Sequence, residues 1–90
     1  MRRVIWTNAA LRDVQRVQDY IRQFNPLAAQ RMALRLISTA QSLAEAPERG
    51  RPVLGGRREL TVVWPYIIRY RVQDDRVAIL RVRHGARRPD

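Results

Sequence analysis

The sequence contains no cysteine and no lysine, and each absence restricts what the protein can do. Without cysteine, neither a disulfide nor a thiolate metal site can form, which suits a reducing compartment. Without lysine, all 18 cationic side chains are arginines, which are too basic to accept a proton at neutral pH. His84, the single histidine, is therefore the one side chain whose ordinary pKa lies near neutrality.

Long apolar stretches are also missing. The longest, residues 62–68, contains Pro65 and is far shorter than the roughly 20 residues of a membrane-spanning helix. The opening MRRVIWTN has basic residues but lacks the apolar core of a signal peptide, and no long basic amphipathic helix indicates a membrane surface. The sequence therefore predicts a soluble cytoplasmic protein with no membrane partner.

At 90 residues the chain has room for one hydrophobic core, so we expect a single domain over residues 1–90. The formal net charge of +10 is the largest departure from average composition. Such an excess of positive charge predicts an anionic partner, either nucleic acid or an acidic protein surface.

Two stretches place apolar residues three and four positions apart, as in helices that bury one face. The first covers residues 8–24 and follows Thr7 and Asn8, either of which can cap a helix. The second covers residues 26–46 and begins with a proline directly after Asn25. So short a connection predicts an antiparallel helical hairpin.

The rest of the chain alternates between polar and apolar residues, except in residues 47–57, where two prolines and three glycines predict a loop. We expect strands over residues 2–7, 58–64, 66–73 and 76–84. The order β-α-α-β-β-β predicts an α+β fold, with the helical hairpin packed on one face of a small, mainly antiparallel sheet.

Regular alternation assigns the residues of the last three strands to a helix-facing side or an open side. We expect the helix-facing side to carry Leu60, Val62, Tyr66, Ile68, Tyr70, Val72, Ala78, Leu80 and Val82. We expect the open side to carry Arg69, Arg71, Arg81 and Arg83, with Ile67, Val77 and Ile79 between them. Like charges on neighbouring strands destabilise a sheet unless something offsets them, so this mixture predicts a docking face for an acidic partner.

An ordered set of short motifs in this chain resembles the RelE/ParE superfamily of bacterial type II toxins. The motifs are Trp6, Ala9-Ala10, Asp13, Tyr20-Ile21, Asn25-Pro26, Ala28-Ala29, Leu43, Pro47, Gly50-Arg51 and residues 57–60, 66–72 and 77–89. The resemblance spans nearly the whole chain. It implies the β-α-α-β-β-β fold, in agreement with the order read from periodicity.

The resemblance also implies an acidic antitoxin that lays a C-terminal segment across the toxin. It leaves two targets open, because ParE-like members inhibit DNA gyrase without being nucleases, whereas RelE-like members cut mRNA in the ribosomal A site. The ending GARRP at residues 85–89 and the absence of lysine and of a terminal tyrosine favour the ParE-like branch. We therefore expect a gyrase inhibitor neutralised by a ParD-like antitoxin, with no small-molecule substrate.

In the RelE-like alternative, cleavage needs a base, an acid and cations. The residues available for these roles are Arg58, Arg69, Arg81 and His84. His84 precedes a glycine and shares its alternation with Val82, which favours a structural role at a strand end. Glu59 has open-side parity but lies among arginines, so we expect an ion pair that lowers its pKa and removes its basicity.

In the ParE-like interpretation, no residue is catalytic, and the contacts to target or antitoxin come from the open side and the tail. The residues expected to make them are Ile67, Arg69, Arg71, Val77, Ile79, Arg81, Arg83, Arg87 and Arg88. We expect no cofactor and no metal, because Asp74-Asp75 has no second acidic cluster and Gly55-Gly56 lacks the context of a phosphate loop. A third possibility, a non-toxic nucleic-acid-binding protein, is disfavoured because no helix-turn-helix or aromatic RNA platform is present.

Overall fold

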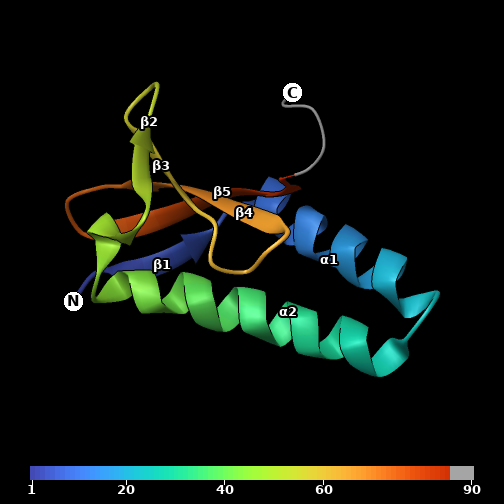
Figure 1. Ribbon diagram of the computed structural model, residues 1–90. Helices are drawn as coiled ribbons and strands as arrows, with labels where there is room; N and C mark the ends of the chain where they lie inside the picture. Colours follow the sequence, from blue (N-terminus) through green and yellow to red (C-terminus); the bar gives the residue numbers. More distant parts are fainter. Residues whose placement is uncertain (86–90) are drawn as a thin grey trace.

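The structure is a computed structural model that describes residues 1–85, so the predicted contact residues Arg87 and Arg88 lie outside it. Within residues 1–85, two α-helices and five strands follow one another (Figure 1). They are β1 (Arg3–Trp6), α1 (Asn8–Arg22), α2 (Pro26–Gln41), β2 (Arg51–Val53), β3 (Arg57–Leu60), β4 (Tyr66–Val72) and β5 (Arg76–His84). Short 3-10 helices at Ser42–Ala44 and Pro47–Arg49 link α2 to β2. The predicted α+β class is confirmed.

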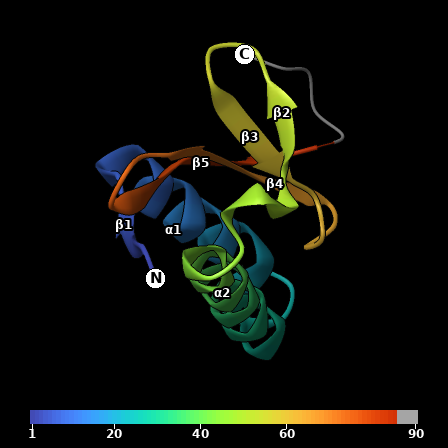
Figure 2. The same cartoon turned by 90° about the vertical axis from the view of Figure 1, so that its left-hand side faces the viewer.

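The five strands form one sheet in the order β1-β5-β4-β3-β2. β1 runs parallel to β5, and every other neighbouring pair is antiparallel, so the sheet is mainly antiparallel as predicted. The helical hairpin covers one face of this sheet, and no helix of residues 1–85 lies over the opposite face (Figures 1 and 2).

α1 is capped by Thr7, one of the two predicted caps, and α2 begins at the predicted Pro26 with Asn25 as its cap. The Thr7 hydroxyl accepts a hydrogen bond from the Ala10 amide at 3.2 Å, and the Asn25 side chain accepts one from the Ala28 amide at 3.0 Å. Each bond satisfies a backbone N–H that the first helical turn leaves without a partner. These caps fix where α1 leaves β1 and where the hairpin turns.

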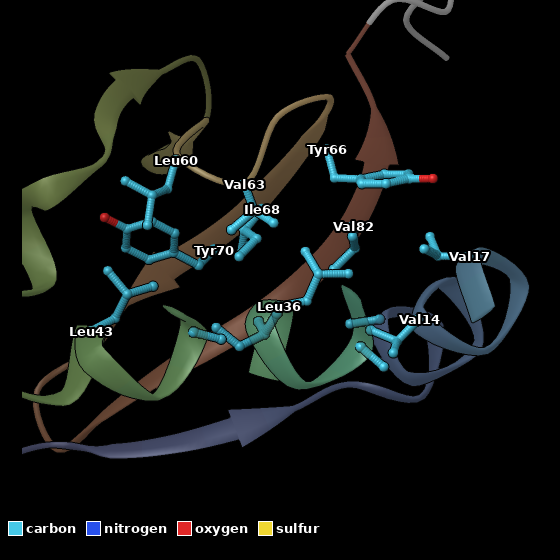
Figure 3. Close-up of a cluster of buried hydrophobic side chains, with 14 of the residues drawn as sticks. Val14, Val17, Leu36, Leu43, Leu60, Val63, Tyr66, Ile68, Tyr70 and Val82 are labelled. Atoms are coloured by element: carbon cyan, nitrogen blue, oxygen red, sulfur yellow. The ribbon is translucent and has the colours of Figure 1, made fainter. Parts of the chain in front are cut away.

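The core lies between the hairpin and the sheet (Figure 3). Leu36 of α2 and Leu43 of the 3-10 helix that follows it meet Ile68 and Tyr70 of β4, and all four side chains are fully buried. The alternation predicted for β4 is confirmed, because Tyr66, Ile68 and Tyr70 are buried in turn.

Two expectations about the entry to the sheet are wrong. Residues 51–53 form the edge strand β2 instead of a loop, since they pair with Arg57–Glu59 and an edge strand tolerates a proline. The next strand, β3, ends at Leu60. The alternation stops there, so Val63 is buried in the core and Val62, expected to face the helices, is 49% exposed.

The open-side placement of Val77 and Ile79 is also wrong, because both side chains are fully buried against the helices. Tyr70 pairs with Ile79 and Arg69 pairs with Arg81, which leaves Leu80 as an extra residue in β5. Such a bulge reverses the alternation. The residues after it keep the predicted sides, and those before it, including Ala78, are exchanged.

The bulge lies where β1 gives way to α1. The Thr7 amide and hydroxyl both bond the Ile79 carbonyl, at 3.1 and 2.8 Å, beside the extra residue.

Neither α-helix in residues 1–85 has the length and apolar character needed to cross a membrane.

Candidate functional site

The sheet surface that faces away from the helices, here called the open face, is strongly cationic. The paired registers of the strands place the following arginines on it: Arg3, Arg51, Arg57, Arg69, Arg71, Arg76, Arg81 and Arg83. Ile5, Ile67 and Ala78 lie between them, and Glu59 of β3 adds one negative charge. The predicted concentration of arginine on this side is confirmed and extends to β1, β2 and β3.

Glu59 is the centre of the first charge cluster. Its carboxylate is only 5% exposed and accepts two hydrogen bonds from Arg69, at 3.0 and 2.9 Å. Arg83 and Arg51 approach the same carboxylate at 3.4 and 3.5 Å from β5 and β2. Four strands of the sheet are therefore joined through one buried acid.

The predicted loss of basicity at Glu59 is confirmed in direction. Burial raises the pKa of the carboxyl, but the hydrogen bonds and charges of Arg69, and after it Arg83, outweigh burial and hold the pKa below its ordinary value. A carboxylate in this state is a weak proton acceptor. Its role here is to neutralise arginines that would otherwise repel one another.

Asp13 of α1 forms the second cluster, at the edge of β5 that β1 does not reach. It is 5% exposed and accepts a 2.9 Å hydrogen bond from the Val82 amide, which replaces a missing strand partner. Arg81 donates through Nε at 2.8 Å and through Nη2 at 3.3 Å, and Arg16 donates at 3.2 Å. Asp13 thus ties α1, the edge of β5 and an open-face arginine together.

These two clusters change the interpretation of the arginines predicted on the open side, because their positive charges are compensated within the chain. The cross-strand pair Arg69 and Arg81 was expected to need an external acid, but Glu59 and Asp13 supply the compensation within the chain. Arg69 and Arg83 remain only 21% and 18% exposed, and Arg81 is 39% exposed. These three side chains stabilise the fold and present only part of their surface to a partner.

Arg71 and Arg57 differ from these three arginines. Within residues 1–85, Arg71 has no hydrogen bond or ion pair, and Arg57 bonds only a backbone oxygen, that of Leu54, at 2.9 Å. Arg57 was not among the predicted site residues, although its alternation with Glu59 places it on the open face. Arg51 was missed because β2 was predicted as loop.

The four residues of the nuclease alternative do not converge. Arg58 lies on the helix-facing side, where it donates a 2.7 Å hydrogen bond to the Gly50 carbonyl. His84 lies on that same side, with its ring 5.5 Å from the ring of Tyr66. Arg58 pairs with Tyr70, and His84 pairs with Tyr66. These two positions are four residues apart along β4, so Arg58 and His84 are separated by about 13 Å along the strand. Arg69 and Arg81 pair with each other on the opposite face, so the structure brings these two together but separates them from Arg58 and His84.

The segment around Gly50 explains why Arg58 is held there. The Tyr70 hydroxyl accepts from the Gly50 amide at 2.8 Å and donates to the Pro47 carbonyl at 2.7 Å. A Cβ atom on Gly50 would lie 2.6 Å from that hydroxyl, so the close approach requires glycine. Arg58 and Tyr70 therefore both hold the 47–50 segment in place, Arg58 through the Gly50 carbonyl and Tyr70 through the Gly50 amide and the Pro47 carbonyl.

A second surface lies on the helical hairpin. A groove of about 470 Å³ is lined by Trp6, Leu11, Val14 and Ile37, with Gln15 and Gln18 at its side. Leu11 and Ile37 are 53% and 45% exposed. Apolar exposure of this extent on a small protein indicates a docking site for another protein.

The described residues contain no group of three or more histidine, cysteine, aspartate or glutamate side chains placed to hold a metal ion. The two buried acids are both occupied by arginines. The candidate site is therefore two surfaces, the cationic open face and the apolar groove, on opposite sides of the molecule.

Comparison with known proteins identifies relatives over nearly the full chain. The profile of a family described as ParE toxin of type II toxin-antitoxin system, parDE, matches residues 4–89. Toxin RelE2 of Caulobacter vibrioides is 60% identical over 87 residues, which cover 97% of this chain and 99% of the relative. Putative toxin Y4kP of Sinorhizobium fredii is 41% identical over 86 residues, covering 93% and 88%.

A solved structure is similar as well. The chromosomal ParDE TA system from P. aeruginosa contains a chain that superposes with a TM-score of 0.85 at 26% sequence identity. The similarity covers 93% of this chain and 96% of that one. The fold and the sequence therefore point to the same group of proteins.

Proposed function

The chain belongs to the ParE toxin family of type II toxin–antitoxin systems, and from that premise we propose that it inhibits DNA gyrase by binding, without chemistry of its own. A ParD-like antitoxin neutralises it. The observation that supports this most is the separation of Arg58, Arg69 and His84, which lie on two faces of the sheet and are each engaged in structural contacts. A nuclease needs its base, acid and cations around one phosphate.

A second candidate function is supported by the names of relatives. Toxin RelE2 at 60% identity bears the name of the ribosome-dependent branch, so mRNA cleavage is the alternative that the experiment must test. In that alternative His84 would have to leave the ring of Tyr66 and reach the open face.

In this proposal the two surfaces bind different partners, the apolar groove the antitoxin and the open face the gyrase complex. An antitoxin requires apolar contact for stable association, and the groove beside Trp6, Leu11 and Ile37 provides it. The net charge of +10 favours an acidic partner and accelerates the encounter. The open face, with Arg71 unpaired within residues 1–85, then contacts the gyrase complex.

The test compares two reactions with the same purified protein. Supercoiled plasmid with gyrase and ATP is scored for linear DNA, and a translating-ribosome reaction is scored for cut mRNA. We expect linear plasmid and intact mRNA. The variant His84→Gln should poison gyrase as well as the wild type does, because the ring contacts Tyr66 and has no target role in this proposal.

Cut mRNA with unaffected gyrase, abolished in His84→Gln, would replace the proposal by the RelE-like alternative. Adding the antitoxin should restore normal supercoiling, which separates specific poisoning from aggregation of DNA by a basic protein.

A further inference from the structure

The hairpin of β2 and β3 projects from the sheet on the side away from the helices (Figures 1 and 2). Its tip consists of Leu54, which is 87% exposed, followed by Gly55 and Gly56 with φ of +80° and +70°. Positive φ at two successive residues is the conformation of a tight hairpin turn that few other residues adopt. The sequence thus builds a short two-stranded ribbon with a narrow end.

Arg57 and Arg71 lie side by side at the base of this tip. Arg58 pairs with Tyr70, so continuing the antiparallel register by one residue places Arg57 opposite Arg71. Both guanidinium groups reach the turn, because a Cβ on Gly55 would lie 3.6 Å from Nη2 of Arg57 and one on Gly56 would lie 3.5 Å from Nη1 of Arg71. The two charges are therefore gathered at one end of the open face.

This pair is not neutralised as most other open-face arginines are. Arg51, Arg69, Arg76, Arg81 and Arg83 each form an ion pair, and within residues 1–85 Arg3 of β1 is the other open-face arginine that forms none. Neither Arg57 nor Arg71 forms an ion pair within residues 1–85, whereas Glu59, the nearest acid along β3, is occupied by Arg51, Arg69 and Arg83. Like charges opposite one another on adjacent strands destabilise a sheet. A pair of like charges that reduces stability, on a face where most other arginines are ion-paired, indicates a function.

We propose that this end of the ribbon, through Arg57 and Arg71, binds the phosphate backbone of duplex DNA. Arginine forms paired hydrogen bonds with phosphate oxygens, and a two-stranded β-ribbon has a width that the DNA major groove admits. The inference rests on the proposed function in that gyrase holds the DNA segment that the ribbon contacts.

An acidic protein segment is the competing occupant, and the surroundings of the pair disfavour it. The neighbours of Arg57 and Arg71 at the tip are two glycines and one exposed apolar residue, Leu54, while Val53 across the ribbon is half-buried. A protein partner needs a continuous apolar surface in addition to charge, and the groove on the helical hairpin offers more of it than the single leucine of the tip. Phosphate binding requires charge alone.

The experiment measures binding of the purified protein, without gyrase, to a short fluorescent DNA duplex by anisotropy between about 50 and 200 mM NaCl. The double variant Arg57→Gln/Arg71→Gln should bind at least about tenfold more weakly. The negative slope of its log K against log salt should become less steep by about 2, since two phosphate contacts are lost. Its melting temperature should equal or exceed that of the wild type.

The matched control is Arg12→Gln/Arg31→Gln, which removes the same charge from exposed positions on the helices. It should retain most of the affinity and the slope. A single-stranded RNA and polyglutamate serve as competing probes. Equal DNA binding by wild type and Arg57→Gln/Arg71→Gln overturns the inference, and so does a loss confined to polyglutamate or to RNA.

Failure of this inference is distinguishable from failure of the proposed function. DNA binding is measured on the free protein, whereas poisoning is measured as linear plasmid in the gyrase reaction. A wild-type protein that binds DNA through the ribbon but leaves gyrase unaffected would contradict the proposed target and still support the ribbon as a DNA-binding element.

Discussion

Glu59 and Asp13 show how individual residues make a chain of 18 arginines foldable. Each carboxylate is 5% exposed and receives hydrogen bonds from at least two arginines. A buried charge destabilises a fold unless it is paired, and so does a cluster of like charges. Placing the acids at the centre of the arginines removes both penalties at once.

Replacing Glu59 by glutamine should lower the free energy of unfolding by roughly 2 kcal/mol at neutral pH, because Arg69 and Arg83 lose their counter-charge while keeping partial contact with water. The pH dependence should change as well. The pKa of Glu59 in the folded state lies below the ordinary value of 4.5, so its contribution is present above pH 4.5 and is lost as pH falls through the folded-state pKa. Urea unfolding between neutral and acidic pH measures both effects.

The exposed Glu45 provides the control for that series. Glu45→Gln should follow the wild-type curve, whereas Glu59→Gln should show a weaker loss of stability in the acidic range. Identical curves for the two variants would contradict the assignment of Glu59 as a stabilising ion-pair centre.

At the scale of elements, the junction of β1, α1 and β5 determines which side chains reach the open face. β1 ends at Trp6, Thr7 bonds the Ile79 carbonyl, and β5 accommodates Leu80 as an extra residue. Beyond that point α1 takes the place of a strand, with Asp13 bonding the Val82 amide. The side chains before the bulge, Val77, Ala78 and Ile79, therefore lie on the sides opposite to those that regular alternation predicts, whereas Arg81 and Arg83 keep theirs.

Replacing Asp13 by asparagine should destabilise the protein by about 2–3 kcal/mol, because charge-assisted bonds to Arg81 and Val82 are weakened at a buried position. Amide hydrogen exchange at Val82 should become faster than in the wild type, which a general loss of stability alone would not confine to this edge. Asp19→Asn, on the exposed side of the same helix, should leave the unfolding midpoint unchanged. Slower or unchanged exchange at Val82 would contradict the role of Asp13.

For the whole molecule, the net charge of +10 governs stability as well as association. We expect the melting temperature to rise by about 4–8 °C as NaCl increases from about 10 to 150 mM, where screening shortens from roughly 30 to 8 Å and relieves repulsion worth about 1 kcal/mol. The buried pairs of Glu59 and Asp13 are screened less and should not reverse the trend. Calorimetry in a dilute buffer measures it.

The variant Arg12→Gln/Arg31→Gln has two fewer positive charges and should show a smaller rise. A melting temperature that falls with added salt would mean that exposed ion pairs outweigh the net repulsion, contrary to the expectation.

The sequence by itself determined the features that depend on neighbours along the chain. The apolar stripes, the caps at Thr7 and Asn25 and the alternation of β4 all involve residues within a few positions of one another. The element order and the concentration of arginine on one side of the sheet followed from these local patterns. The predicted ion pairing of Glu59 followed from its parity.

The tertiary structure alone decided the features that depend on residues far apart in the chain. The bond between Arg81 and Asp13 spans 68 positions, and the bulge next to Ile79 lies where Thr7 of a distant segment bonds the Ile79 carbonyl. β2 exists only because β3 offers an edge to a proline-containing segment. Packing against remote partners therefore determines which arginines are neutralised within the fold, and leaves Arg57 and Arg71 without an ion pair in the described part of the chain.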